Sequence, residues 1–326
     1  MKYFLIMNPG SKGGKSKKHF NKIFSAFNKA KFDFDFKYTS KLEDAYNFSV
    51  EANKETYDVI VAVGGDGTIN SVLNGFFDLE GKLISNAKMA VIYTGTSPDF
   101  CKSYNIPRKL DEAIQTIINN YSKQIYIGKL LCSSDNNKNF NYSDISEIKS
   151  PKLKYFGCCA NIGLGATLAR KANSGIRKYL GDTLGTFISL IGTLVVYKAN
   201  DFIVKKDDAQ NTISKLYNLS VGRTKFIASG IKISNKINYA NQGFYCLTAR
   251  KINTSNILSS INKVYSGKEF KNTDILSLDY CNTIEIFGNF KNPEIELDGD
   301  PIGYLPCKIE ISTDKLNLIV KRDIFK

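Results

Sequence analysis

The chain has 326 residues, a length that predicts two domains, because a single hydrophobic core seldom extends so far. Its composition, with 43% hydrophobic and 23% charged residues, is typical of soluble globular proteins. The net charge of +14 favours an anionic partner such as a nucleotide, a nucleic acid or an acidic membrane, although a general excess of lysine would produce the same charge. No run of four consecutive Lys or Arg residues occurs, which argues against a basic nucleic-acid-binding tail.

Seven cysteines and a single histidine, His19, limit the metal and redox chemistry of the chain. The cysteine count is odd and no Cys-x-x-Cys pair occurs, so neither a disulfide framework nor a zinc cluster is expected. The first nine residues are too few for a signal peptide. The longest apolar stretch, residues 183–197, is shorter than the roughly 20 residues that cross a bilayer. We therefore expect a reduced, cytoplasmic protein.

The first third of the chain alternates strand patterns with helical spacing. In chain order, the expected strands are residues 3–7, 34–39, 59–63 and 89–93, and the expected helices are residues 17–29, 42–52, 69–77 and 110–119. This alternation predicts a Rossmann-like parallel sheet with helices on both faces. Ligands of such sheets bind beyond the carboxyl ends of the strands, so the turns after the first, third and fourth strands are where functional residues are expected.

From about residue 125 the pattern changes to short strands bounded by Asn, Gly and Ser, which predicts a mainly antiparallel, β-sandwich-like second domain. The expected strands are residues 125–132, 154–160, 218–221, 243–248, 283–287 and 308–312, and the expected helices are residues 168–172, 183–197 and 257–265. Residues 133–150 form a polar, Asn-rich loop between two of these strands. We place the nucleotide-binding α/β domain at residues 1–122, with residues 313–326 returning to it, and the β-rich domain at residues 123–312.

The third strand runs into the string Gly64-Gly65-Asp66-Gly67-Thr68, with a helix directly behind it. Glycines allow the backbone to approach a ligand closely and to adopt positive φ. A helix N-terminus adds free N–H groups and positive potential, which suits a phosphate ester. Asp66 is suited to hold a metal ion or to orient a nucleophile.

Two further turns carry similar residue types. Residues 8–15, Asn-Pro-Gly-Ser-Lys-Gly-Gly-Lys, offer backbone donors and two lysines for a phosphate, without the spacing of a P-loop. Residues 93–100 contain Gly95, Thr96 and Asp99. Each turn also has a purely structural interpretation, as a surface turn or, for Asp99, as a helix N-cap.

Together these strings resemble the signatures of lipid kinases. Residues 64–68 resemble the signature that diacylglycerol, sphingosine, ceramide and NAD kinases share, and residues 8–15 resemble the Asn-Pro opening of lipid kinases. Residues 93–100 resemble the segment Pro-x-Gly-Thr-x-Asn-Asp-Phe, and residues 161–173 also fit the family. Residues 296–301, Glu-Leu-Asp-Gly-Asp-Pro, resemble the Asp-Gly-Glu-Pro segment of bacterial diacylglycerol kinases, although Asp-Gly-Asp-Pro alone is also a good surface turn. The chain is thus similar, from residue 3 to about 320, to the diacylglycerol kinase catalytic-domain family of the bacterial soluble type.

The resemblance implies an active site in the cleft between the two domains, with ATP and Mg²⁺ as cofactors. It implies that Asp300 is the general base, with Asp66 as the other catalytic carboxylate, and that Asp66 and Asp99 hold Mg²⁺. The residues that it implies for nucleotide binding are Asn8, Pro9, Gly10, Ser11, Thr39, Gly64, Gly65, Asp66, Gly67, Thr68, Gly95 and Thr96.

The chain departs from the family pattern at several of these positions. Ser71 stands where the family has Glu, Pro98 stands where it has Asn, and Asp300 replaces Glu with a side chain one methylene shorter. Asn241 and Gln242 stand where bacterial members place an Asp near a structural Mg²⁺, which predicts that this second metal site is weakened or lost.

We therefore expect an ATP- and Mg²⁺-dependent lipid kinase, a transferase of phospholipid metabolism that phosphorylates a hydroxyl of diacylglycerol or a related lipid. The expected partners are a nucleotide and a lipid at an anionic membrane surface, reached by peripheral association; residues 183–197 would contact the membrane or, more simply, lie in the core. A homodimer is left open, and nucleic-acid binding is not expected. Two alternatives remain: a nucleotide-binding regulator or degenerate kinase without phosphotransfer, and an NAD kinase.

Overall fold

The computed structural model describes residues 1–41, 43–96, 98–135, 144–171, 197–227, 231–233, 243–251, 272–288 and 294–322. The chain divides into two compact units, one made of Met1–Ile127 with Ser312–Lys326 and the other of Gly128–Ile311. The predicted domain limits at residues 122 and 312 differ from these by a few residues, because the strand that follows residue 121 pairs within the first unit. Two predicted helices lie outside the described residues: residues 183–196 of the first, which was predicted to end at Tyr197, and residues 257–265. Asn241 and Gln242 lie outside them as well.

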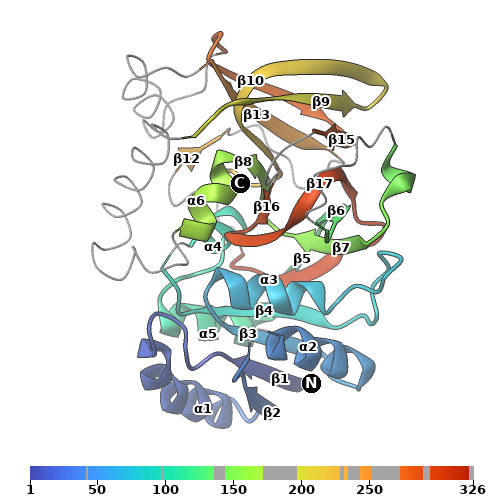
Figure 1. Cartoon of the computed structure of the whole chain (residues 1–326). Helices are drawn as coiled ribbons and strands as arrows, with labels where there is room; N and C mark the ends of the chain where they lie inside the picture. The colour runs from blue at the N-terminus through green and yellow to red at the C-terminus, as the bar shows by residue number, and fades with distance from the viewer. Residues whose placement is uncertain are drawn as a thin grey trace. The chain divides into compact units, whose positions relative to one another are not determined.

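The first unit contains a six-stranded sheet in the order β2-β1-β3-β4-β18-β5 (Figure 1). Its strands are β1 (Lys2–Met7), β2 (Asp33–Tyr38), β3 (Val59–Gly64), β4 (Lys88–Tyr93), β5 (Ser122–Ile125) and β18 (Leu316–Ile319). The first four strands and β18 run parallel, and β5 runs antiparallel to β18. Strands β1 and β3 are almost continuously apolar because both of their faces are buried.

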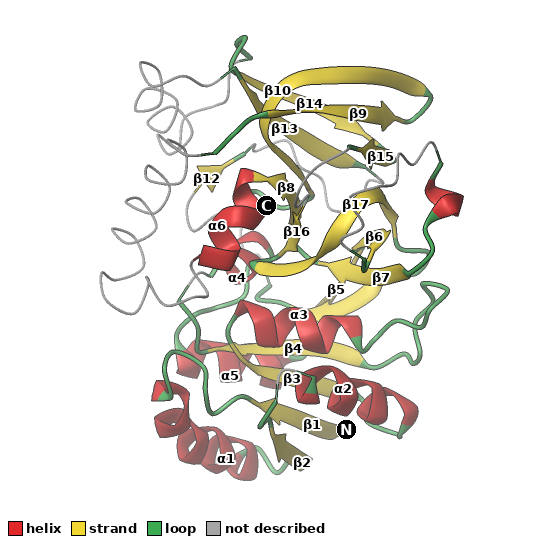
Figure 2. Cartoon of the chain, in the orientation of Figure 1, coloured by secondary structure: helices red, strands yellow, loops and turns green. Residues whose placement is uncertain are grey.

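Helices cover both faces of this sheet, as Figure 2 shows. They are η1 (Lys15–His19), α1 (Phe20–Lys29), α2 (Asp44–Lys54), α3 (Asp66–Asn74), α4 (Asp99–Ser103) and α5 (Leu110–Asn119). Helix α1 buries Phe20, Ile23 and Phe27, which share one face at helical spacing, in a core that also includes Ile114 and Ile117 of α5. Helices α2 and α3 pack together on β3. The α/β part of the predicted fold class is confirmed.

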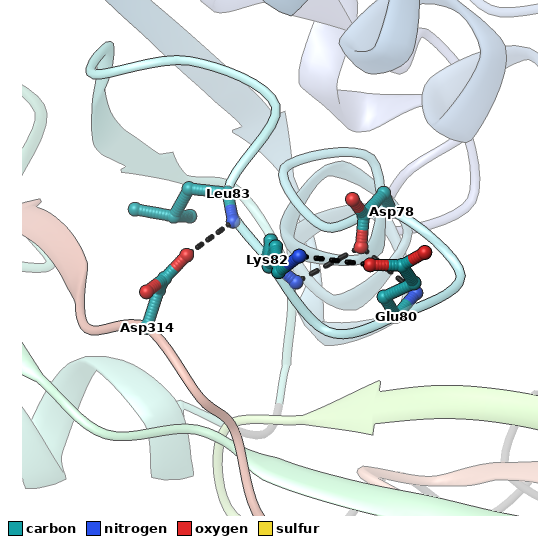
Figure 3. A network of polar contacts seen from close by, with 5 residues as sticks. All are labelled: Asp78, Glu80, Lys82, Leu83 and Asp314. Atoms are coloured by element: carbon teal, nitrogen blue, oxygen red, sulfur yellow. Dashed lines mark hydrogen bonds and ion pairs between the residues drawn. The ribbon is translucent and has the colours of Figure 1, made fainter.

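The C-terminal segment returns to the first sheet, where β18 lies between β4 and β5. Just before β18, the carboxylate of Asp314 accepts the backbone N–H of Leu83 at 2.8 Å (Figure 3). Leu83 follows a tight turn in which the carboxylate of Asp78 accepts the N–H groups of Glu80 and Lys82 at 2.8 and 2.9 Å. These hydrogen bonds join two segments of the first unit that lie 231 positions apart in the sequence.

The second unit is built on one antiparallel sheet of ten strands. They are β6 (Gly128–Ser133), β7 (Pro151–Phe156), β8 (Cys159–Gly163), β9 (Asn200–Lys206), β10 (Ala209–Gly222), β13 (Phe244–Arg250), β14 (Leu276–Cys281), β15 (Ile284–Phe287), β16 (Glu294–Leu297) and β17 (Asp300–Ile311). The sheet closes on itself because β9 pairs with both β15 and β10, so that one continuous sheet encloses the apolar core as two sandwich layers would. The antiparallel second domain is confirmed.

The remaining described elements of the second unit are short. They are η2 (Ile145–Glu147), α6 (Leu164–Lys171) and the two-residue strands β11 (Phe226–Ile227) and β12 (Ile231–Lys232). The sequence patterns did not predict β9, β14 or β16, nor the long first half of β10, which consists mainly of polar, exposed residues. Within the described part of the chain, no helix is long and apolar enough to cross a membrane.

Candidate functional site

The three turns that the sequence singles out lie at the carboxyl edge of the parallel sheet, after β1, β3 and β4. Asn8 connects the first turn to the second: its Nδ2 donates to Oγ1 of Thr68 at 2.8 Å, and its Oδ1 accepts the N–H of Gly10 at 2.9 Å. The backbone N–H of Asn8 donates to the carbonyl of Val63 at 2.9 Å. One side chain therefore fixes the loop after β1 against the first turn of α3.

A buried chain of hydroxyl groups connects the first turn to the third. Thr94 Oγ1 donates to Ser11 Oγ at 3.1 Å, Ser11 Oγ lies 3.3 Å from the carbonyl oxygen of Thr94, and Ser16 Oγ donates to Thr94 Oγ1 at 3.1 Å. All three residues are buried. Buried polar groups of this kind are stable only when they are hydrogen-bonded, so the two turns hold each other in place.

The second and third turns approach each other so closely that only glycine fits. A Cβ atom on Gly95 would lie 2.7 Å from the Cα of Gly65 and 2.8 Å from the Oη of Tyr93. A Cβ atom on Gly64 would lie 2.4 Å from Oγ1 of Thr68. The contact between Gly65 and Gly95 therefore brings the turns after β3 and β4 together, and Gly64 makes room for the Thr68 side chain within the second turn.

Asp66 lies in the first turn of α3, which begins at this residue and not at Ile69 as the sequence pattern predicted. The predicted start was late because the glycines around Asp66 mask the helical spacing. The Oη of Tyr93 donates to Oδ2 of Asp66 at 3.1 Å. Burial, followed by the charge of Asp66, raises the pKa of the Tyr93 phenol, so this phenol keeps its proton and acts as a donor.

Asp99 is the first residue of α4, and the helix N-cap is Pro98, so the interpretation of Asp99 as the N-cap is wrong. The charge of Asp99 acts in the same direction as that of Asp66 in raising the pKa of the Tyr93 phenol. Among the residues that the structure describes, no group of three or more His, Cys, Asp or Glu side chains could hold a metal ion. Asp66 follows β3 and Asp99 follows β4, so both predicted metal ligands lie in segments at the carboxyl edge of the same sheet.

The other predicted nucleotide-binding residues also lie at this edge. Thr39 follows β2, and its N–H donates to the carbonyl of Met7 at the end of β1, at 3.0 Å. Pro9 and Gly10 belong to the turn after β1, Gly67 belongs to the first turn of α3, and Thr96 is exposed in the turn after β4. The structure thus brings every predicted nucleotide-binding residue to the carboxyl edge of one sheet.

In the second unit, Asp300 begins β17 directly after a two-residue hairpin turn from β16. The turn residues Asp298 and Gly299 have φ values of 50° and 104°, which are typical of a type I′ turn. Burial raises the pKa of the Asp300 carboxyl above its ordinary value. A carboxylate with a raised pKa is a stronger base than an exposed one, so its environment suits the predicted role.

The Asp298 carboxylate anchors this hairpin to the turn between β7 and β8. It accepts the backbone N–H groups of Gly157, Cys158 and Cys159 at 2.8, 3.0 and 2.9 Å. Burial raises the pKa of Asp298 to about 6, although these three donors lower it. The turn is therefore not the simple surface turn that its residues alone would allow.

Glu296 supports the same hairpin from β16. Its side chain is only 5% exposed; Oε2 accepts Nδ2 of Asn161 at 2.6 Å, and Oε1 accepts the backbone N–H of Gly299. Burial raises the pKa of Glu296 to about 8, and the charges of Asp298 and Asp300 act in the same direction. Sequence reasoning missed Tyr93, Glu296, Asp298 and Asn161 as parts of the candidate site. For the hairpin, the alternation of acidic residues at 296, 298 and 300 was the available signal.

The fold described above is similar to that of a solved diacylglycerol kinase from Bacillus anthracis. The two structures superpose with a TM-score of 0.69 at 19% sequence identity, over 99% of this chain and 98% of that one. This likeness defines the class of fold.

The family is indicated by the sequence of the first unit. Residues 2–130 match the model of the diacylglycerol kinase catalytic domain, which confirms the predicted resemblance. A diacylglycerol kinase of Bacillus subtilis is 35% identical over 127 residues, which are 39% of this chain and only 41% of that relative's length. A Streptococcus pneumoniae protein that is provisionally named a lipid kinase is 27% identical over 98% of both chains.

Proposed function

We propose that the chain is an ATP- and Mg²⁺-dependent lipid kinase that transfers the γ-phosphoryl group of ATP to a hydroxyl of diacylglycerol or a related lipid. The observation that carries this proposal is the convergence of three glycine turns, with Asp66 among them, at the carboxyl edge of a parallel sheet. Phosphoryl transfer needs little covalent chemistry, and positioning and charge neutralisation supply most of the rate enhancement.

The turns supply the nucleotide site in this proposal. Backbone N–H groups around Gly65 and Gly95 and at the start of α3 face the phosphates, because both the dipole of the nine-residue helix and its free N–H groups favour anions there. Thr39 and Thr96 lie at the same edge of the sheet, where they would contact the nucleotide.

Asp66 and Asp99 would hold the magnesium ion. Mg²⁺ is usually bound by one or two carboxylates together with substrate phosphates and waters, and it does not need a cage made of protein alone. Two aspartates in the segments that follow β3 and β4 fit this donor set. When bound, the ion would neutralise the negative charge that develops on the phosphoryl group.

Asp300 would take the proton of the lipid hydroxyl as it attacks the γ-phosphorus atom. A base must be deprotonated before it can accept that proton, and a pKa closer to neutrality makes it more effective at cellular pH. Burial moves the pKa of Asp300 in this direction. The aspartate side chain is shorter than the glutamate of the related motif, and β17 begins at this residue, so the backbone of the hairpin sets its reach.

The proposed lipid substrate lies at an anionic membrane surface, which the chain would approach peripherally. The net charge of +14 supports this, as does the group of exposed lysines Lys12, Lys15, Lys17 and Lys18 beside the turn after β1. Each basic residue near an anionic bilayer contributes about 1 kcal/mol to binding.

The test is transfer of labelled γ-phosphate from ATP–Mg²⁺ to mixed micelles of diacylglycerol and related lipids. We expect a labelled lipid with the natural chain, and a loss of at least about a hundredfold with Asp66→Ala and with Asp300→Asn. Asp111→Asn, which changes an exposed carboxylate paired with Lys22, is the matched control and should keep full turnover.

Other outcomes decide between the alternatives. ATP binding without any labelled lipid would indicate a nucleotide-binding regulator, and labelled NAD in a parallel assay would indicate an NAD kinase. Full turnover of Asp300→Asn would show that the base is assigned to the wrong residue.

A further inference from the structure

A row of polar side chains crosses the second unit beside the Asp298–Gly299 turn. In the sheet, Asn161 of β8 pairs with Glu296 of β16 on one side and with Ser220 of β10 on the other. Their neighbours along each strand, including Ala160, Ile162, Leu219 and Val221, belong to the enclosed apolar core. Because side chains alternate along a strand, the polar row lies on the opposite, outer face of the sheet.

Hydrogen bonds connect this row from end to end. Ser220 Oγ donates to Asn161 Oδ1 at 2.5 Å, and Asn161 Nδ2 donates to Glu296 Oε2 at 2.6 Å. The other oxygen of Glu296 accepts the N–H of Gly299. Each link has a defined donor and acceptor, since the amide of Asn161 offers its oxygen to Ser220 and its nitrogen to Glu296.

Helix α6 covers the row, as its contacts with β8, β10 and β16 show (Figure 1). Gly165 makes this approach close: a Cβ atom there would lie 2.8 Å from Cβ of Asn161, and its N–H donates to Oδ1 of Asn218 at 2.7 Å. Asn218 in turn donates to Ser220 at 2.9 Å. The row is therefore buried under a helix, and its hydrogen bonds are shielded from competing water.

We propose that Glu296, oriented by Asn161 and Ser220, is the positioning residue that holds Asp300 in place. This inference rests on the proposed function, in which Asp300 is the base. Glu296 binds the N–H of Gly299, the residue directly before Asp300, while Asp298 binds three N–H groups of the β7–β8 turn. Both residues of the turn are therefore tied to the sheet, and the backbone that carries Asp300 cannot shift without breaking a buried hydrogen bond.

Positioning matters here because the base must lie within hydrogen-bonding reach of the hydroxyl that it deprotonates. A displacement of about 1 Å in an active site can lower the rate by about a hundredfold. Burial keeps the Glu296 carboxyl largely protonated at neutral pH, since its pKa is raised to about 8, and this limits the negative charge beside Asp300. The same carboxyl still accepts two hydrogen bonds through its oxygens.

The test compares Glu296→Gln with the double variant Glu296→Gln/Asn161→Asp. In the single variant, the introduced glutamine can accept the Gly299 N–H, but its amide nitrogen then faces the amide nitrogen of Asn161, and two donors oppose each other. In the double variant, the aspartate introduced on β8 accepts from the glutamine introduced on β16 and from Ser220, so every hydrogen bond of the row is restored with the carboxylate moved to β8. Asp207→Asn is the control, because Asp207 anchors another turn of this unit by accepting the N–H groups of Asn282 and Thr283 at 2.9 Å.

We expect Glu296→Gln to lower kcat for the lipid at least about tenfold, with the Kd of ATP unchanged within about twofold, and the double variant to recover most of the loss. Asp207→Asn should keep the natural kcat. Ser220→Ala, which removes the hydrogen bond to Asn161 and the one from Asn218 but leaves Glu296 in place, should fold and lower kcat about threefold, and it serves as the readout if Glu296→Gln does not fold.

Natural kcat in both Glu296→Gln and Ser220→Ala, with Asp300→Asn inactive, would overturn the positioning role while leaving the base assignment intact. A low kcat that the double variant does not restore would also overturn it, because hydrogen bonding would then not be the cause. Full activity of Asp300→Asn would instead overturn the base assignment on which this role depends.

Discussion

The acidic residues of the candidate site are held differently in the two units of the chain. In the first unit, Asp66 lies among glycines, and the turns around it are fixed by backbone contact and by the side chains of Asn8 and Ser11. In the second unit, Asp298 and Glu296 are enclosed by the sheet and bind backbone N–H groups themselves.

This difference has a chemical consequence. The glycine turns place Asp66 at the N-terminus of α3, an arrangement suited to a phosphate and a cation. The hairpin raises the pKa of Glu296, Asp298 and Asp300 through burial, an arrangement suited to holding or accepting a proton. In the proposed function, acidic residues would therefore bind an ion in the first unit and accept a proton in the second.

The strongest effect that we expect is on the pH dependence of stability, which depends on the buried carboxyl groups of the β16–β17 hairpin. Burial raises the pKa of Glu296 from 4.5 to about 8 and that of Asp298 from 3.8 to about 6. At a pH between the two pKa values of either group, the folded state therefore holds a proton that the unfolded chain has lost. Stability should therefore fall as the pH rises, by up to about 1.4 kcal/mol per pH unit for each group. Urea unfolding of the natural chain at several pH values between pH 5 and pH 8 measures this slope, because this range lies between the ordinary and raised pKa values of one or both groups.

Glu296→Gln should flatten the part of the slope that lies above the pKa of Asp298, and Asp207→Asn should leave it unchanged. Stability that rises with pH over this range in the natural chain would contradict the burial of both carboxyl groups in the protonated form.

Smaller effects, on stability and on ATP affinity, are expected when the close packing of the glycine turns is disturbed. Gly95→Ala places a Cβ atom 2.7 Å from the Cα of Gly65, so we expect a loss of about 2 kcal/mol in stability and a Kd for ATP at least about tenfold higher. Gly65→Ala places its Cβ atom 3.3 Å from Gly95 and should have a smaller effect on both. Titration with a fluorescent ATP analogue and thermal unfolding measure the two quantities.

Gly75→Ala provides the control for this pair, because its Cβ atom would lie 2.4 Å from Cβ of Ser49, at the far end of α3. It should destabilise the first unit without a specific loss of ATP affinity. Equal ATP affinity in Gly95→Ala and Gly75→Ala would mean that the contact between the turns does not form the nucleotide site.

The weakest effect concerns the phenol of Tyr93, which gives Asp66 a hydrogen bond at 3.1 Å. Tyr93→Phe should raise the Mg²⁺ concentration for half-maximal turnover about tenfold, because partners of a metal-binding carboxylate orient it. It should cost about 1 kcal/mol of stability. Binding of Mn²⁺ with a non-hydrolysable ATP analogue, followed by electron paramagnetic resonance, gives a readout that is independent of turnover.

Tyr57→Phe is matched to Tyr93→Phe, because Tyr57 Oη donates to Oδ2 of Asp35 at 2.7 Å in the same unit. It should lose similar stability and keep the natural affinity for the metal. If both variants bind Mn²⁺ alike, Tyr93 does not orient Asp66 for the cation.

Much of the first unit could be predicted from the sequence, because its signals are local. The apolar runs of β1, β3 and β4 and the helical spacing of α1 and α5 specify elements that tertiary contacts did not alter. The glycine strings then mark where the strands end. The start of α3 at Asp66 was missed because glycine disfavours a helix locally, and only packing against the turn after β4 compensates for this.

The second unit was predicted less well. Strand β9 has polar residues at both ends, and β16 alternates polar and apolar residues over only four positions, which is too short a run to identify a strand by itself. Their strand conformation depends on pairing with partners far along the chain, such as β15 and β8.

Local patterns in the sequence were enough to specify most elements of the first unit and the three glycine turns, because strand runs, helical spacing and turn residues act over a few positions. The choice of Asp66, Asp99 and Asp300 depended in addition on the resemblance of their segments to those of lipid kinases. Long-range contacts in the folded chain were needed to show that Tyr93 faces Asp66, and that Glu296 meets both Asn161, 135 positions away, and the turn before Asp300. Hydrogen bonds and the pKa values of buried groups depend on which strands become neighbours, and sheet pairing over long separations leaves little trace in a local pattern.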